Sequence, residues 1–142
     1  MDQRSLYQRL GGSGAIVAVV DDFVARCAAD SRINQKFART DVPRLKKMLV
    51  DQVTTATGGP ATYAGRTMKE THEGMGVTAG EFDALVGNLV ATLDRFSVPA
   101  AEQQELLGVL GSLRGDIVEA ESAETGTPLP ESYRNAPPLV HA

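Results

Sequence analysis

Apolar positions recur every three or four residues along most of this chain, the spacing that places side chains on one face of an α-helix. The first stripe predicts a helix over residues 15–29 and consists of Ile16, Val19, Val20, Phe23 and Cys27. Residues 31–37 are expected to form a short helical turn. A second helix is predicted to begin at 41–43, where Pro43 suits a first turn, and to end before the glycines at 58 and 59. Its stripe consists of Leu45, Met48, Leu49, Gln52, Val53 and Ala56.

The second half of the chain continues this pattern. Residues 62–72 form a weaker helical segment that nearby glycines close. Thr78 and Glu81 have the spacing of a capping box, in which each side chain bonds to the other residue's backbone amide. This box opens a helix that is expected to run to about Phe96, with a stripe of Phe82, Leu85, Val86, Leu89, Val90 and Leu93.

The last predicted helix opens at Pro99 and carries Leu106, Leu110, Leu113 and Ile117 on one face. No run of alternating apolar and polar residues indicates a strand, so the pattern predicts an all-α fold with one domain over residues 1–121. Residues 122–142 are rich in Pro and polar residues. We expect them to form a mobile C-terminal tail.

Length and charge restrict the class of protein. A chain of 142 residues is long enough for one domain that buries ~65–70% of the surface of its unfolded chain. The net charge of −4, without a basic block, gives no electrostatic reason to expect nucleic acid or an anionic membrane as a partner. The first ten residues lack the apolar core of a secretory signal, and no apolar run approaches ~20 residues. We therefore expect a soluble, cytoplasmic protein.

Cysteine and histidine narrow the candidate chemistry. Cys27 is the only cysteine, which excludes an intrachain disulfide, a CxxCH attachment site for c-type haem and a cysteine-ligated cluster. Its place on an apolar stripe favours inert core packing. Of the two histidines, His141 lies in the tail, and His72 precedes a strongly amphipathic helix. A lone imidazole among apolar helices suits a single axial bond to a haem iron, the alternative being a hydrogen-bonded structural histidine.

Four motifs, taken in their order and spacing, resemble a known family. They are LYQRLGG at 6–12, Phe37 followed by Thr40-Asp41, GGP at 58–60 followed by YAGRTM at 63–68, and His72 followed by FDALVGNL at 82–89. From residue 5 to about residue 118 the chain resembles the truncated haemoglobins, of the group called group I.

The resemblance implies a globin-like, two-over-two helical sandwich around a non-covalently held haem b, with His72 as the proximal iron ligand. It also implies pocket walls formed by Phe37, Leu45, Met68, Phe82, Val86 and Leu89. Carboxylates favour cationic and hydroxyl partners, so four residues are candidates to meet the haem propionates: Thr40, Tyr63, Arg66 and Lys69. As an alternative, Arg66 and Lys69 are solvated surface residues.

The distal side departs from the family pattern. Members of this group commonly carry a tyrosine and one or two glutamines there, which donate hydrogen bonds to bound dioxygen. The matching positions here hold Val24, Leu45 and Leu49, and none of these side chains can donate a hydrogen bond. Each lost donor removes a net ~1 kcal/mol or more. We therefore expect O₂ to bind more weakly or dissociate faster than in a polar-pocket relative, with CO penalised less and NO dioxygenation disfavoured.

Met48 is a second departure, because it shares the stripe that would face the iron. In some family members a side chain at this position of the distal helix coordinates the iron. A thioether is a soft ligand, and His/Met ligation raises the reduction potential of a haem. We therefore hypothesise a hexacoordinate form in which Met48 occupies the sixth site and must leave before a gas binds. The alternative is flexible core filler. Gln52, one turn further on, is expected to point toward the rim or solvent.

These features leave four functions open. The leading one is a haem protein that reversibly binds O₂, CO or NO and relies on a reductase that the sequence does not name. The second is an enzyme, an NO dioxygenase or a peroxidase-like protein, which the apolar distal residues disfavour. The third is electron transfer or gas sensing through His72 and Met48. The fourth is a haem-free all-α interaction module in which His72 and Phe37 are core residues.

Overall fold

The computed structural model describes residues 4–37, 41–59, 72 and 74–129. These ranges contain α-helices and one 3-10 helix: α1 (Leu6–Leu10), α2 (Gly12–Ala29), η1 (Asn34–Phe37), α3 (Val42–Ala56), α5 (Ala79–Arg95), α6 (Ala100–Ser112) and α7 (Arg114–Ile117). The described residues form no strand, and the β-type pairing among them is an isolated bridge between Thr78 and Ala120. The predicted all-α fold is confirmed. In the same ranges no helix is both long and apolar enough to cross a membrane.

The local signals at the helix starts act as the sequence predicts. The Thr78 hydroxyl accepts a hydrogen bond from the Glu81 amide at 3.0 Å, and the Glu81 carboxylate accepts one from the Thr78 amide at 3.0 Å. This capping box satisfies amides that have no partner within α5. Asp41 caps α3 by accepting a hydrogen bond from the Arg44 amide at 3.2 Å, with a proline in the first turn.

Two helix boundaries differ from the sequence prediction. The helix α2 begins at Gly12 and not at residue 15. The prediction placed the start too late because the first turn of α2 carries no part of the apolar stripe. Gly11 and Gly12 have φ of 112° and 79°, a left-handed conformation that lets the chain break between α1 and α2. The last predicted helix is divided at Leu113 into α6 and α7. The segment predicted over 62–72 lies outside the described residues except for His72, which is helical.

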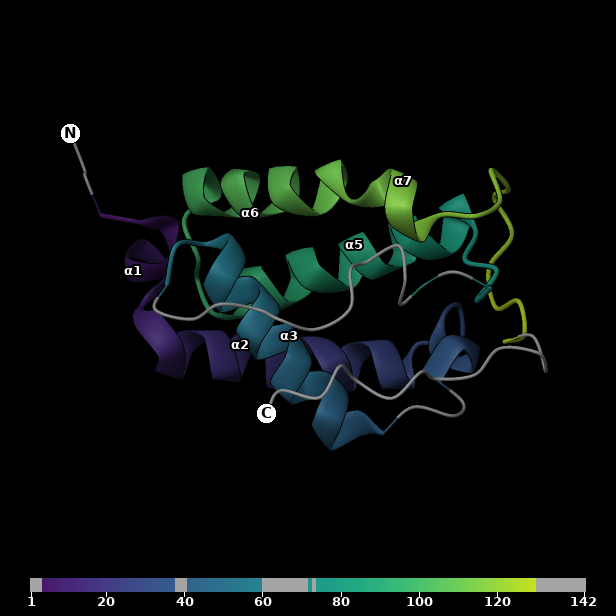
Figure 1. Ribbon diagram of the computed structural model, residues 1–142, viewed down its shortest axis with the longest axis horizontal. Helices are drawn as coiled ribbons and strands as arrows, with labels where there is room; N and C mark the ends of the chain where they lie inside the picture. Colours follow the sequence, from purple (N-terminus) through teal and green to yellow (C-terminus); the bar gives the residue numbers. More distant parts are fainter. Residues whose placement is uncertain (1–3, 38–40, 60–71, 73, 130–142) are drawn as a thin grey trace, which may run out of the picture.

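The helices form two packed layers (Figure 1). The helix α2 contacts both α3, which crosses it, and α5, which runs beside it. A short turn at 96–99 connects α5 to α6, so these two helices lie side by side in opposite directions. The side chain of Leu93 on α5 is completely buried, in a cluster with Leu89, Leu106 and Leu6. The central helices α2 and α5 therefore provide walls for whatever lies between the layers.

A partly buried carboxylate joins the two central helices. Asp22 of α2 accepts hydrogen bonds from Thr92 at 2.8 Å and Arg95 at 2.5 Å of α5, and from Arg26 at 2.7 Å on its own helix. The Arg26 bond is the largest of the causes that lower the pKa of Asp22. A similar connection joins Asp30, at the end of α2, to Asn88 of α5 at 3.0 Å. These bonds fix α2 against α5 along the length of the layer.

The start of the predicted C-terminal tail packs against the helices, and its mobility stays a prediction. Residues 119–129 leave α7 and descend along the end of the molecule towards η1, as the yellow segment of Figure 1 shows. They bond to the start of α5 and to η1, and the Leu129 side chain is buried beside Met75, Val77 and Phe82. Their polar composition is compatible with this packing because most of the bonds use backbone groups. Residues 130–142 lie outside the described part of the chain.

Candidate functional site

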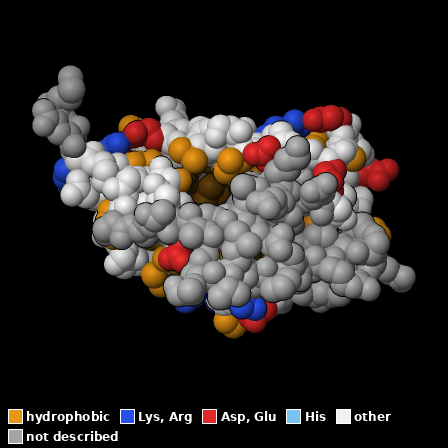
Figure 2. Space-filling model, in the orientation of Figure 1, with side chains coloured by type: hydrophobic (Ala, Val, Ile, Leu, Met, Phe, Trp, Pro, Cys, Tyr) orange, Lys and Arg blue, Asp and Glu red, His pale blue; other side chains and the backbone are white. Residues whose placement is uncertain are grey.

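A cavity of about 460 Å³ lies between the two layers. Residues from α2, η1, α3, α5, α6 and α7 line it, together with the loop that precedes α5. Figure 2 shows hydrophobic side chains around a hollow between α6 and α3. This volume is in the range of pockets for small molecules and cofactors. The apolar stripes of the sequence therefore surround a space large enough for a ligand.

His72 borders this cavity. The residue is helical and half-buried, and its carbonyl accepts a hydrogen bond from the Met75 amide at 3.1 Å. The chain turns directly after it through Gly74 and Gly76, whose φ values of 86° and 71° favour glycine. This turn leads into α5, and His72 contributes one imidazole to a wall that is otherwise mainly apolar.

The structure brings most of the described candidate residues to the cavity. The residues that line it are Val24 from α2, Phe37 from η1, Leu45, Met48 and Leu49 from α3, and Phe82 and Leu89 from α5. These residues come from positions up to 65 apart in the sequence, and their meeting depends on the packing of α2 against α3 and α5. Five further candidates lie outside the described residues: Thr40, Tyr63, Arg66, Met68 and Lys69.

Val86 is the candidate that the structure places elsewhere. It packs against the cluster of Met75, Val77, Phe82, Ile117 and Leu129 and does not line the cavity. On α5 the cavity side is formed by Phe82, Leu85 and Leu89, and Val86 is rotated about 100° from Leu85. The apolar stripe of α5 is thus wider than the part that lines this cavity, and Val86 as a wall of a haem pocket stays a prediction.

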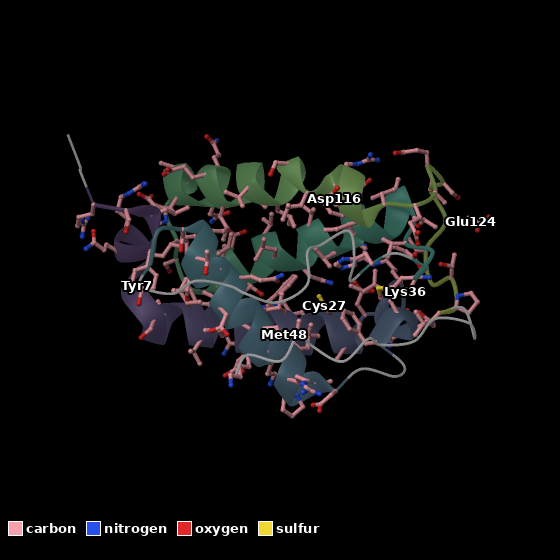
Figure 3. All side chains as sticks on the ribbon, viewed as in Figure 1. Tyr7, Cys27, Lys36, Met48, Asp116 and Glu124 are labelled. Atoms are coloured by element: carbon pink, nitrogen blue, oxygen red, sulfur yellow. The ribbon has the colours of Figure 1, made fainter. Side chains whose placement is uncertain are left out.

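The three residues predicted for the distal side converge. Val24 is buried in a cluster against which Leu45 and Leu49 of the neighbouring helix pack. All three line the cavity, and none can donate a hydrogen bond into it. Met48 also lines the cavity, and Figure 3 shows it on α3, in front of α2. Gln52 is half-buried and borders the cavity, whereas the sequence indicated the rim or solvent.

Several cavity residues were not identified from the sequence. Phe23 of α2 and Leu85 of α5 belonged to recognised apolar stripes, and their periodicity was the available signal. The walls from α6 and α7 include Leu106, Val109, Leu110, Leu113 and Ile117. These positions were seen as an apolar helix face, but the sequence could not indicate which ligand or helix they would face.

Two charged residues, Lys36 and Glu81, also border this apolar cavity. Their exposed fractions are 4% and 2%, and the Lys36 ammonium lies 3.6 Å from the Glu81 carboxylate. Lys36 donates hydrogen bonds to the Thr127 carbonyl at 3.0 Å, the Thr127 hydroxyl at 2.7 Å and the Pro128 carbonyl at 3.1 Å. The charges are thus directed towards the C-terminal segment. A single lysine in a short turn gave no sequence signal of burial.

Cys27 borders the cavity as well and is 2% exposed. Burial raises the pKa of its thiol to about 12, and Asn88 donates a weak hydrogen bond to its sulfur at 3.8 Å. The thiolate is the nucleophilic and metal-binding form of cysteine, so this residue stays an uncharged part of the wall near neutral pH. The prediction of core packing agrees with this environment.

The composition of the cavity wall fits a haem. A haem held without covalent bonds requires two opposed apolar surfaces and an axial donor for the iron. Here the opposed surfaces are supplied by α2 and α3 on one side and by α5 and α6 on the other, and His72 supplies an imidazole at the edge. The described walls contain this one imidazole and no cluster of oxygen or sulfur ligands that could hold a metal ion by itself. This donor set matches the axial ligation of a porphyrin iron.

Comparison with known proteins gives matches over most of the chain. Residues 5–119 match the family described as "Bacterial-like globin". The chain is 35% identical over 120 residues to the group 1 truncated haemoglobin GlbN of Mycolicibacterium paratuberculosis, covering 84% of this chain and 88% of that protein. It is 36% identical over 115 residues to the group 1 truncated haemoglobin of Tetrahymena pyriformis, covering 81% and 95%.

Solved structures give the same result. The truncated haemoglobin of Tetrahymena pyriformis in its Fe(III) form superimposes with a TM-score of 0.78 at 36% identity, covering 81% of this chain and 98% of that one. The 2/2 haemoglobin of Synechococcus sp. PCC 7002, in the cyanomet state and with covalently attached haem, has a TM-score of 0.78 at 34% identity and the same coverage. The arrangement of helices around the cavity is therefore that of a two-over-two fold.

Proposed function

Because this chain belongs to the bacterial-like globin family, as a group 1 truncated haemoglobin, we propose that it binds one haem in the cavity and a diatomic gas on the iron. The observation that carries the proposal is the position of His72, an imidazole at the edge of an otherwise largely apolar space of about 460 Å³. When bound, the haem supplies an iron that changes between ferrous and ferric states and takes O₂, CO or NO as a ligand.

His72 is the proposed proximal ligand. Its imidazole must be neutral at the nitrogen that meets the iron, and the other nitrogen then serves as a hydrogen-bond donor that fixes the ring. Phe37, Phe82 and Leu89 would hold the flat faces of the macrocycle and exclude water, which protects the reduced iron. Thr40, Tyr63, Arg66 and Lys69 remain the proposed partners of the propionates, and Met68 a proposed wall.

Val24, Leu45 and Leu49 form the proposed distal surface. Three solved variants of the Tetrahymena pyriformis protein each carry one substitution, one at a tyrosine and two at different glutamines. The spacing between those three positions equals the spacing from Val24 to Leu45 and from Leu45 to Leu49. This match supports the assignment of the three apolar residues to the positions of polar ones. A pocket without these donors favours CO over O₂, and it disfavours NO dioxygenase or peroxidase chemistry, which needs a distal donor or acid.

A second candidate function is electron transfer or gas sensing through His72 and Met48. It is favoured by the presence of Met48 on the cavity wall beside Leu45 and Leu49. If the thioether holds the sixth site, the reduction potential is raised, and CO binding is slowed by the competing side chain. The ferrous absorption spectrum of Met48→Leu tests this role, with Met75→Leu, another methionine of the cavity wall, as the matched control. An unchanged ferrous spectrum removes Met48 from the iron.

The haem is proposed to be held without a covalent bond, because the chain contains no CxxCH motif and Cys27 is protonated. Acidified butanone extracts a non-covalent haem into the organic layer and leaves a covalent one with the protein. Haem retained in the aqueous layer would show that this chain follows the Synechococcus protein instead. A reductase that returns the iron to the ferrous state is a proposed partner, as are the gases themselves.

The decisive experiment compares absorption spectra of the ferric, ferrous and carbonyl forms of the parent with those of His72→Gly. We expect a Soret band in the parent and a weakened or shifted band in the variant, restored by free imidazole, which refills the axial position. His141→Gly is the control, as it removes the other histidine. Protein that stays colourless when expressed with ample haem would refute haem binding and favour a haem-free interaction module. A Soret band that His72→Gly leaves unchanged would refute ligation of the iron by His72.

A further inference from the structure

The turn that follows His72 is held by the carboxylate of Glu119, which lies more than 40 residues further along the sequence. The two oxygens of Glu119 accept hydrogen bonds from the amides of Gly74 at 3.0 Å and Gly76 at 2.7 Å. Both glycines have positive φ, which points their N–H groups to the same side. Backbone amides in such turns form concavities that bind anions. In this chain the anion is the side chain of Glu119.

Backbone bonds extend this connection on both sides of Glu119. The amides of Glu119 and Ala120 donate to the Val77 carbonyl at 2.8 and 3.2 Å. The Ala79 amide donates to the Ala120 carbonyl at 2.9 Å, and the Gly80 amide donates to the Ser122 carbonyl at 2.9 Å. We call residues 119–129 the C-terminal strap. The strap is therefore bonded at several points along the chain from Gly74 to Gly80.

The other end of the strap is fixed to η1. The Gly126 amide donates to the Arg32 carbonyl at 2.5 Å. Thr127 donates to the Glu81 carboxylate through its amide and its hydroxyl, both at 2.8 Å, and it accepts from Lys36. Figure 3 labels Glu124 of the strap and Lys36 of η1, which lie at the same end of the molecule. The strap thus runs from the His72 turn to the segment that leads into α3.

Gly80 allows the strap to lie so close to α5. A Cβ atom at this position would overlap the carbonyl oxygen of Ala123 and would lie 2.7 Å from the carbonyl oxygen of Glu124. Gly87, two turns further along the same helix, has no atom within 4 Å of such a Cβ. Glycine costs helix stability relative to alanine, so its presence at residue 80 is explained by the strap and not by the helix.

We propose that Glu119 is a positioning residue for His72 and that the C-terminal strap sets the orientation of the proximal imidazole. The proposal rests on the haem ligation by His72 proposed above. A turn with two glycines has many accessible conformations, and Glu119 restricts them by binding both amides at once. The bond between an imidazole and iron depends on how outer residues fix the ring, so release of the turn changes the iron even though Glu119 touches neither group.

The test uses the full chain loaded with haem and two kinds of substitution. Glu119→Ala removes both acceptors, Glu119→Gln retains one, and Gly80→Ala displaces the strap without altering Glu119. The controls are Glu121→Gln, which removes a carboxylate of the strap that bonds to Arg114, and Gly87→Ala, which adds the same methyl group where there is space. The measurements are the iron–imidazole stretching band in the ferrous resonance Raman spectrum and the rate of haem transfer to excess apomyoglobin.

Each exposed hydrogen bond of this kind contributes about a threefold factor. We expect haem transfer about tenfold faster for Glu119→Ala, about threefold faster for Glu119→Gln, and at least threefold faster for Gly80→Ala. The stretching band should shift or broaden in all three, and both controls should match the parent. A purely structural role would lower the resistance to urea but leave the band unchanged.

The outcomes separate this proposal from the proposed function. A normal Soret band in the parent, with unchanged band position and transfer rate in Glu119→Ala and Gly80→Ala, overturns the positioning role and leaves haem binding intact. A parent without a Soret band refutes haem binding, and the positioning role with it. Faster amide exchange of Gly74 and Gly76 in Glu119→Ala, together with a shifted band, supports the proposal.

Discussion

Replacement of Glu81 by glutamine should destabilise the folded chain strongly. Glu81 is 2% exposed, and its carboxylate accepts hydrogen bonds from the Thr78 amide and from the amide and hydroxyl of Thr127. It is also the anionic partner of the buried Lys36 ammonium at 3.6 Å. A glutamine has the same shape but carries no charge, and it offers one oxygen where the carboxylate offered two.

The expected loss is about 3 kcal/mol of unfolding free energy, because breaking a buried ion pair from one side costs ~3–5 kcal/mol. We take the lower end of that range, since Lys36 keeps three oxygen acceptors on Thr127 and Pro128. Lys36→Met should cost about 2 kcal/mol, because the oxygens of Thr127 and Pro128 lose a donor, while the Glu81 carboxylate loses its cation but keeps its hydrogen bonds from Thr78 and Thr127. The double variant should cost about 3 kcal/mol and not the sum, because its second substitution removes a charge that the first has already left unpaired.

Urea unfolding of the full chain, followed by far-ultraviolet circular dichroism, measures these differences. The control is Glu121→Gln, which removes one partner of the ion pair with Arg114, whose side chains are 40% and 71% exposed. Surface pairs of this kind contribute less than ~1 kcal/mol. The reasoning fails if Glu81→Gln costs no more than Glu121→Gln, or if the costs of Glu81→Gln and Lys36→Met add to within ~0.5 kcal/mol.

Three other predictions follow from the cavity wall and from Asp30. Val24→Tyr places a hydroxyl donor on the proposed distal surface and should slow O₂ dissociation about tenfold in flash photolysis, with a smaller effect on CO; equal effects on both gases would contradict hydrogen bonding as the cause. Cys27, with its buried thiol of pKa about 12, should react with Ellman's reagent at pH 8 only after unfolding, and rapid labelling of the folded chain would show that the wall opens. The hydrogen bond with Arg32 is the main cause that holds the pKa of Asp30 well below its ordinary value. The ionised Asp30 carboxylate therefore stabilises the folded chain fully above about pH 4, and this stabilisation is lost as the pH falls through the folded-state pKa. The urea midpoint of Asp30→Asn should therefore fall less between pH 5 and pH 2 than that of the parent, and parallel curves would exclude Asp30 from this acid response.

The sequence predicted the helices well where the cause is local. The capping residues at Thr78 and Asp41 and the spacing of the apolar stripes act within one or two turns, so they could be recognised without a structure. The prediction that Val24, Leu45 and Leu49 lie together came from the family resemblance. Periodicity alone places each of them on an apolar face but does not indicate which faces meet.

The contacts that the sequence could not predict join residues that are distant in the sequence. Val86 and Leu85 are both on the apolar side of α5, and only the positions of α6 and α7 determine which of them faces the cavity. Lys36 in a short polar turn and Thr127 in a Pro-rich segment each indicate solvent exposure when taken alone. In the structure Lys36 is buried and Thr127 is half-buried, because both contact Glu81, and no local pattern contains this contact.

The bonds between Lys36 and Thr127 connect positions 91 residues apart, which has a consequence for synthesis on the ribosome. Contacts of such long range form late, because the intervening chain must be made first. A nascent polypeptide that has emerged only as far as residue 121 already contains every apolar stripe, yet the Lys36 ammonium still lacks the Thr127 and Pro128 acceptors that it has in the finished molecule. Completion of this region therefore waits until residues 127 and 128 have been translated, and truncation by a premature stop codon near residue 121 would yield a collapsed but incompletely closed product.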